Sequence, residues 1–177
     1  MQKTATFSNE DTIWYEIEML RYCYSFYAST GSGSEDQRNR YVHLECFLLH
    51  YRNLVACFSG KHHRQGDIDF SNVAEWSSRP VPSSDEVSAV MQSAATLDDE
   101  YYRDLSQFLA HVTSRRRDAK KWSVKIMNER MEGVIKLFSQ SFPSTLRLCP
   151  DERASEVSLD SASTATFQVY PSPWSNG

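Results

Sequence analysis

The stretch SEDQRNRYVHLECFLLHYRNLVACFSG, residues 34–60, decides the fold class of this chain. Its apolar side chains recur three and four residues apart, which is the spacing of one face of an α-helix. The residues of this stripe are Tyr41, Leu44, Phe47, Leu48, Tyr51, Leu54, Val55 and Phe58. The pattern predicts one helix from Ser34 to Ser59, stopped by Gly60, with the stripe buried against other helices.

The segment before this stretch predicts another helix, which begins near Ser8 and continues through Ser29. Ser8 and Asp11 have the spacing of a capping box, with Asp in place of the usual Glu. The glycines of Gly31-Ser-Gly33 then interrupt the helical pattern, because glycine is a poor helix former. Two long helices joined by a short loop are therefore expected to lie antiparallel.

The segment after it is a long connector, Lys61 to Ser84, which is unusual inside a compact domain. Phe70, Val73 and Trp76 have the spacing of a short helical turn that packs on the core. The sequence thus predicts that aromatic side chains hold this connector against the helices.

Two further helical regions follow the connector. The first begins at Asp85 and runs to about Ser114, with an expected interruption near Ala94 to Leu97. The second runs from about Asp118 to Ser141 and is ended by Pro143. Its apolar face is Trp122, Ile126, Met127, Met131, Val134, Ile135 and Phe138.

Composition supports the same fold class. Gly and Pro number only six each, whereas sandwiches and barrels need many tight turns. We predict an all-α, antiparallel bundle of about four to five helices over residues 1–143. Residues 144–177 are rich in Ser, Thr and Pro and are expected to form a partly ordered tail, with Thr164 to Tyr170 as one short extended segment.

Charge and cysteine usage indicate the compartment. The net charge of −4 argues against broad binding to nucleic acid or membrane surfaces, and no apolar run is long enough to span a bilayer. The N-terminal residues do not resemble a signal peptide. The four cysteines lack C-x-x-C spacing and are expected to be reduced, buried thiols. A cytoplasmic protein without membrane association is predicted.

Two groups of side chains, one of His and Cys and one of His and Asp, contain residue types that can bind a metal. His43, Cys46, His50 and Cys57 share one flank of the helix over residues 34–59, and His62-His63 precede Asp67 and Asp69. Neither group has an H-E-x-x-H or paired C-x-x-C signature. We expect an ordinary helix flank and a solvated loop, with no metal and no cofactor.

Arg38 and His43 form an R-x4-H pattern of the kind found in HEPN-type ribonucleases. In such a site the His transfers a proton at the ribose and the Arg stabilises the phosphate. On a regular helix, however, Arg38 and His43 lie roughly 140° apart. The alternative interpretation is a solvated helix start.

His111 followed by Arg115, Arg116 and Arg117 forms a basic cluster near a helix end. Cations at a helix C-terminus interact favourably with the helix dipole, which is one explanation for the cluster. The other is an anion site, in which His111 exchanges a proton and an arginine grips a phosphate or carboxylate.

Three motifs, taken in order, resemble a bacterial family of small helical proteins of HEPN-like type. They are His50-x-Arg52-Asn53-Leu54, then Asp67-x-Asp69-Phe70 with Trp76, then Ala110-His111-Val112-Thr113-x-x-Arg116 with Trp122. The resemblance covers roughly Tyr41 to Phe138. It implies a helical bundle, a cytosolic location and dimerisation, but no established activity.

The sequence therefore predicts a binding or structural module. Arg52, Asp67, His111 and Arg116 are expected to form a polar network between helices and connector, because a buried Arg needs a carboxylate partner. His50 and Arg115 belong to the same polar or anion-binding group. The alternative is a metal-independent endoribonuclease that uses His111 with Arg116, or His43 with Arg38. A homodimer and an RNA or protein partner are compatible with both.

Overall fold

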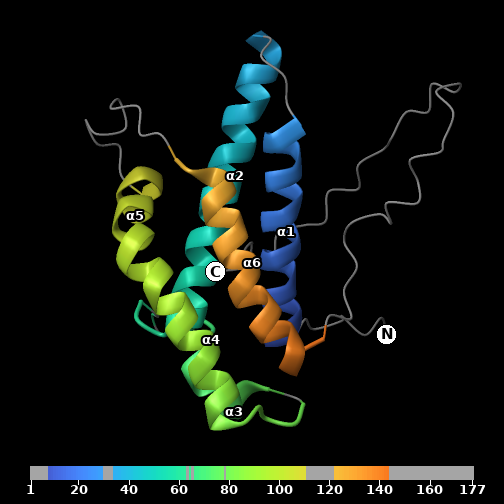
Figure 1. The fold of residues 1–177 in the computed structure, drawn as a ribbon, viewed down its shortest axis with the longest axis vertical. Coiled ribbons are helices and arrows are strands. Elements are labelled where there is room, and N and C mark those ends of the chain that lie inside the picture. The colour runs from blue at the N-terminus through green and yellow to red at the C-terminus, as the bar shows by residue number, and fades with distance from the viewer. Residues whose placement is uncertain are drawn as a thin grey trace, which may run out of the picture.

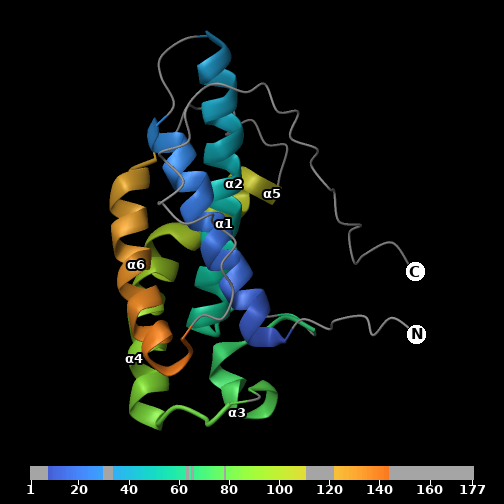
Figure 2. The same ribbon diagram turned by 90° about the vertical axis from the view of Figure 1, so that its right-hand side faces the viewer.

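The computed structural model describes residues 8–29, 34–62, 64, 66–77, 79–110 and 122–143. These residues form an all-α bundle, and no strand occurs among them. Figures 1 and 2 show two long helices beside a second pair of helical segments, with a short helix in the connector at the lower end. The predicted fold class is confirmed. The predicted tail, residues 144–177, lies outside the residues described.

Helices α1 (Asn9–Ser29) and α2 (Ser34–Ser59) lie antiparallel along the length of the molecule (Figure 1). The capping box that begins α1 is formed as predicted: the Asp11 N–H donates to Ser8 Oγ over 3.1 Å, and the Ser8 N–H donates to Asp11 Oδ2 over 3.2 Å. Helix α2 has the predicted bounds. Gly60 follows it with a φ of +67°, which is the left-handed conformation of a helix stop.

The connector carries the predicted helical turn. A 3₁₀ turn, η1 (Phe70–Asn72), leads into the short helix α3 (Val73–Trp76). Asp69 fixes both, because its side chain accepts a hydrogen bond from the Ser71 N–H over 2.8 Å and its carbonyl accepts one from Trp76 Nε1 over 2.8 Å. Phe70 and Val73 are buried in the core.

The next segment contains three helical pieces in direct succession: α4 (Ser84–Leu97), a π-helical turn η2 (Asp98–Tyr102) and α5 (Arg103–Ala110). The predicted interruption at residues 94–97 is wrong, because Ala94 and Leu97 are buried and the α-helix continues through both. The irregularity in this helical segment comes directly after Leu97, where the π turn η2 begins. The predicted extension of this helix to Ser114 lies outside the described residues.

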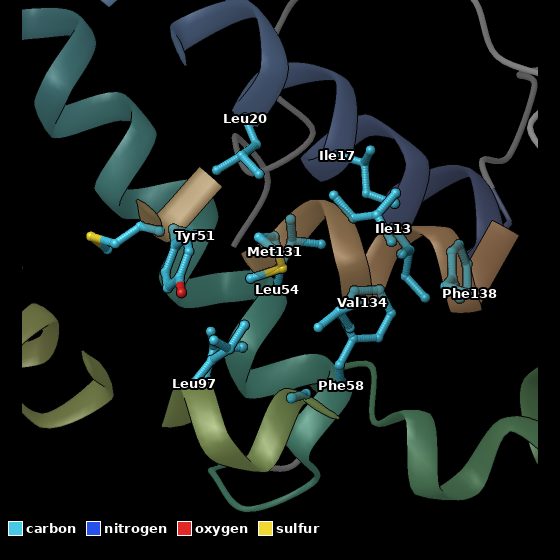
Figure 3. Packing of buried hydrophobic residues seen from close by; sticks show 14 of the residues in the cluster. Ile13, Ile17, Leu20, Tyr51, Leu54, Phe58, Leu97, Met131, Val134 and Phe138 are labelled. Atoms are coloured by element: carbon cyan, nitrogen blue, oxygen red, sulfur yellow. The ribbon is translucent and has the colours of Figure 1, made fainter. Parts of the chain in front are cut away.

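Helix α6 (Val124–Ser141) completes the bundle and runs beside α4 (Figures 1 and 2). Figure 3 shows side chains of α1, α2, α4 and α6 meeting in one core. Across this core Trp14 Nε1 donates to the carbonyl of Phe142 over 3.0 Å, which ties the start of α1 to the end of α6. The predicted start of this last helix near Asp118 is wrong, because Trp122 and Ser123 are not helical and the helix begins at Val124.

Two residues that the sequence predicted to be buried are exposed. Tyr41 is 60% exposed because the first turns of α2 rise above the other helices (Figure 1). Ile126 is 48% exposed. It precedes the buried Met127 by one residue, and one residue along an α-helix is a rotation of about 100°. The rest of the two stripes is buried or packs against the core, so the predicted core is otherwise confirmed.

Within the described ranges, no helix combines the length and the apolar character that crossing a bilayer requires.

Candidate ligand-binding cleft

A half-open cleft of about 470 Å³ lies between α1, α2, the connector and the π turn η2. Its polar lining includes Glu16 from α1, Arg52 and Asn53 from α2, and His62 and Asp67 from the connector. Two members of the predicted polar network, Arg52 and Asp67, are therefore brought to one place. We call this feature the α1–α2 cleft.

Arg52 reaches the cleft from α2. Its Nε donates to Ser106 Oγ over 3.2 Å, and its guanidinium carbon lies 5.7 Å from the ring centroid of Tyr102. Cation–π contacts of this kind orient a guanidinium and stabilise it. Among the described residues no carboxylate forms an ion pair with Arg52. Its positive charge is therefore available to a ligand.

Asp67 does not provide the ion pair that the sequence suggested for Arg52. Its Oδ2 instead accepts a hydrogen bond from the backbone N–H of Arg64 over 2.8 Å, and the Asp67 N–H donates to the Arg64 carbonyl over 2.9 Å. These bonds close a tight loop at Gly66, whose φ is +94°. Asp67 thus shapes the connector wall of the cleft. The other two members of that network, His111 and Arg116, are outside the described residues, as is Arg115.

Glu16 forms the opposite wall. Its Oε2 lies 2.8 Å from His50 Nδ1 and accepts a hydrogen bond from Asn53 Nδ2 over 3.2 Å. His50 is buried, with 8% of its surface exposed, and the edge of its ring faces Tyr15. The carboxylate of Glu16 is thereby fixed by two side chains of α2. Its second oxygen, Oε1, has no hydrogen-bond partner among the described residues.

The connector is held to the π turn by Asp98. The buried side chain of Asp98 lies 2.7 Å from His62 Nε2 and 3.3 Å from Lys61 Nζ, and Asp99 accepts a hydrogen bond from Lys61 Nζ over 2.8 Å. The hydrogen bonds to Asp99 and Asp98 raise the pKa of Lys61. The ring of His62 also stacks on Tyr102. The rim of the cleft is therefore a charged and aromatic clamp rather than an unattached loop.

The thiols near the cleft are poorly suited to nucleophilic chemistry. Cys57 lines the cleft, and burial raises its pKa well above the ordinary value of 9.0. Burial likewise raises the pKa of Cys23, between α1 and α2, to about 12. A thiol with a raised pKa stays protonated at neutral pH, whereas attack and metal binding need the thiolate. In the part of the chain that is described, no three His, Cys, Asp or Glu side chains converge as metal ligands would.

Arg38 and His43 of the R-x4-H pattern do not meet in a site. The ring of His43 stacks on Phe26 with centroids 4.9 Å apart, and Tyr22 lies beside it. Arg38 instead lines a shallow depression farther along the outer face of α2, with Tyr41. The helical geometry that separates them by roughly 140° is thus preserved.

Sequence reasoning missed several residues of the cleft. Glu16 belongs to no motif. Its role depends on contacts with His50 and Asn53, which follow it by 34 and 37 positions in the sequence. His62 was considered only as a metal ligand beside Asp67 and Asp69. Tyr102 belongs to none of the motifs, although the π turn places it at the cleft.

Comparison with known proteins supplies no relative for this cleft. No protein-family model, no curated protein and no solved structure matches the chain. The resemblance to HEPN-like proteins therefore stays a prediction from sequence.

Proposed function

We propose that this protein is a cytoplasmic binding module that holds a small ligand in the α1–α2 cleft, with Arg52 as the anchor for an anionic group. The single observation that carries the proposal is the state of Arg52. It lies in a cleft, Ser106 and Tyr102 orient it, and no described carboxylate neutralises it.

A charge held in this way is unusual without a partner. Partly burying an ion costs solvation free energy, and proteins normally offset that cost with an opposite charge or a ligand. Arg is also the side chain best suited to bind a carboxylate or phosphate through two parallel hydrogen bonds. An anionic ligand would supply the missing partner.

The size and lining of the cleft support a small molecule. A volume of about 470 Å³ lies within the range of ligand pockets in proteins, roughly 300–1,000 Å³. Apolar side chains such as Ile13, Leu54 and Ile68 line it together with the charged groups. That mixture is typical of sites in which a few polar groups orient an apolar ligand body.

The proposal is tested by adding N-acetylleucine or inorganic phosphate to the purified full chain. Binding is measured by isothermal titration and by the shift in thermal unfolding, against sodium chloride at the same ionic strength. A ligand at ten times its Kd should stabilise the fold by roughly 1.4 kcal/mol. Arg52→Gln should abolish this effect.

The matched control is Arg103→Gln, which removes an exposed arginine on α5 that does not line the cleft. It should leave binding unchanged. Equal binding by the Arg52→Gln variant, or no binding to the native chain of either anion or of leucine, which also carries a carboxylate, would overturn the proposal.

A further inference from the structure

Glu16 and Arg52 carry opposite charges on the walls of the same cleft, yet they do not form an ion pair with each other. Each is instead fixed by other side chains. His50 and Asn53 hold Glu16, while Ser106 and Tyr102 hold Arg52. The cleft therefore presents a negative and a positive group that are both already oriented.

Each of these groups keeps unused binding capacity. Only Oε2 of Glu16 has partners among the described residues, so Oε1 is left to accept a hydrogen bond. Only Nε of Arg52 donates to a described residue, so both terminal nitrogens are left to donate. Groups held in place before binding lose little entropy when a ligand arrives, which increases affinity.

From this arrangement we infer that the ligand is a small zwitterion: its cationic amine binds Glu16 and its carboxylate binds Arg52. The inference rests on the proposed function and specifies its ligand. The apolar body of the ligand packs against Ile68, an apolar lining residue of the cleft that is only partly buried.

Ligands with a single charge fit the cleft less well. An anion held by Arg52 leaves Oε1 of Glu16 without a hydrogen-bond partner among the described residues and brings a like charge into the same cleft. A cation held by Glu16 leaves Arg52 unneutralised in the same way. Since a desolvated charge without a partner costs free energy, only a ligand with both charges satisfies both walls.

The test compares zwitterions with their single-charge counterparts on the native full chain. Leucine and 6-aminohexanoate carry both charges at different separations, N-acetylleucine carries only the anion, and leucinamide carries only the cation. Isothermal titration should show at least one zwitterion binding at least tenfold more tightly than both single-charge probes. This comparison needs no variant, so it does not depend on how a substitution affects folding.

Two variants then assign the ends of the ligand. Glu16→Gln keeps hydrogen bonds to His50 and Asn53 but loses the charge, so it should weaken zwitterion binding at least tenfold while N-acetylleucine binding is kept or strengthened. Arg52→Gln should weaken binding of the zwitterion and of N-acetylleucine. Glu129→Gln, an exposed position on α6, should change neither.

The outcomes separate this inference from the proposed function. If N-acetylleucine binds as tightly as both zwitterions and depends on Arg52, the zwitterion inference is overturned and the anion site stands. If no probe binds the native chain, both are overturned. Tighter zwitterion binding that Glu16→Gln leaves unchanged would overturn the assignment of the amine to Glu16.

Discussion

The imidazole of His62 lies flat on the ring of Tyr102, with centroids 3.7 Å apart and ring planes 2° from parallel. This contact joins the first residues of the connector to the π turn η2. Asp98, at the start of the same turn, contacts His62 from the side. The rim of the α1–α2 cleft is therefore built from residues that are distant in sequence and mutually dependent.

Replacing Asp98 tests this clamp. Asp98→Asn removes a buried charge that faces His62 and Lys61, and we expect a loss of roughly 1.5–3 kcal/mol in the free energy of unfolding. Urea unfolding measures the change, and hydrogen exchange of residues 61–70 should accelerate. Asp99→Asn removes an exposed carboxylate whose ion-pair partner among the described residues is Lys61, and it should cost under about 1 kcal/mol. Equal losses in the two variants would show that burial of Asp98 is unimportant.

Two aromatic residues with the same predicted role should differ sharply in their contribution to stability. Phe138 is fully buried and contacts Trp14, Phe58 and Phe142, so Phe138→Ala should cost roughly 3–5 kcal/mol. Tyr41 is exposed, so Tyr41→Ala should change the free energy of unfolding by no more than about 0.5 kcal/mol. Chemical denaturation of both variants measures the difference, and a large loss for Tyr41→Ala would contradict the burial described here.

Two glycines should respond to alanine in opposite directions. At Gly60 the backbone is left-handed, and an added Cβ would lie 3.2 Å from both Asp69 Oδ1 and Met91 Cε. Gly60→Ala should therefore destabilise the fold by roughly 1–2 kcal/mol. Gly133 lies within α6 with no atom within 4 Å of the added Cβ, so Gly133→Ala should stabilise by roughly 0.5–1 kcal/mol. Thermal unfolding of both variants gives the two signs, and a stabilising Gly60→Ala would contradict the conformation of this turn.

Stability should fall in acid in a way that depends on Glu86. Hydrogen bonds from the Ser83 side chain and backbone lower the pKa of Glu86 below its ordinary value of 4.5. The pKa of Glu86 is lower in the folded chain than in the unfolded chain, so the stability that Glu86 contributes is fully present above its unfolded-state pKa. That stability is lost as the pH falls through the folded-state pKa. We expect Glu86→Gln to be less stable than the native chain at neutral pH but to differ little from it well below pH 4.5. Urea unfolding at both pH values measures the difference in the free energy of unfolding between the variant and the native chain. If this difference is the same at both pH values, the ionised capping box is not its source.

The ribonuclease alternative has a direct test. Under the binding-module proposal, the purified chain should not cleave labelled RNA in EDTA beyond a mock preparation. Cleavage that His111→Ala abolishes, but that His43→Ala leaves intact, would replace that proposal with an enzyme. The His43 variant is the informative comparison, because His43 stacks on Phe26 and does not meet Arg38.

Much of the fold follows from local sequence patterns. The bounds of α2 are predictable because Gly60 stops a long helical pattern, and the start of α1 because Ser8 and Asp11 make a local capping box. The exposure of Tyr41 is not predictable in the same way. It depends on how far α2 extends beyond its neighbours, which no single helix specifies. The π turn is likewise not predictable from the regular spacing of apolar residues that indicates an α-helix.

The cleft was only partly predictable for the same reason. Arg52 and Asp67 were identified from short motifs, and both line the cleft. Their contacts were not foreseen, since Arg52 is held by Ser106, 54 positions later. Glu16 belongs to no motif at all, and only the packing of α1 against α2 brings it to His50.

The π turn η2 joins α4 to α5 without a break in the helical chain. Five residues, Asp98–Tyr102, occupy this wider turn, which makes i→i+5 hydrogen bonds in place of i→i+4 bonds. A π turn accommodates one residue more than an α-helical turn does, so deleting one of these five would let α4 and α5 join as a continuous α-helix. Tyr102 is the last residue of this turn, so the deletion would disturb its contacts with Arg52 and His62. The cleft thus depends on the length of the chain at this point as well as on the residues that line it.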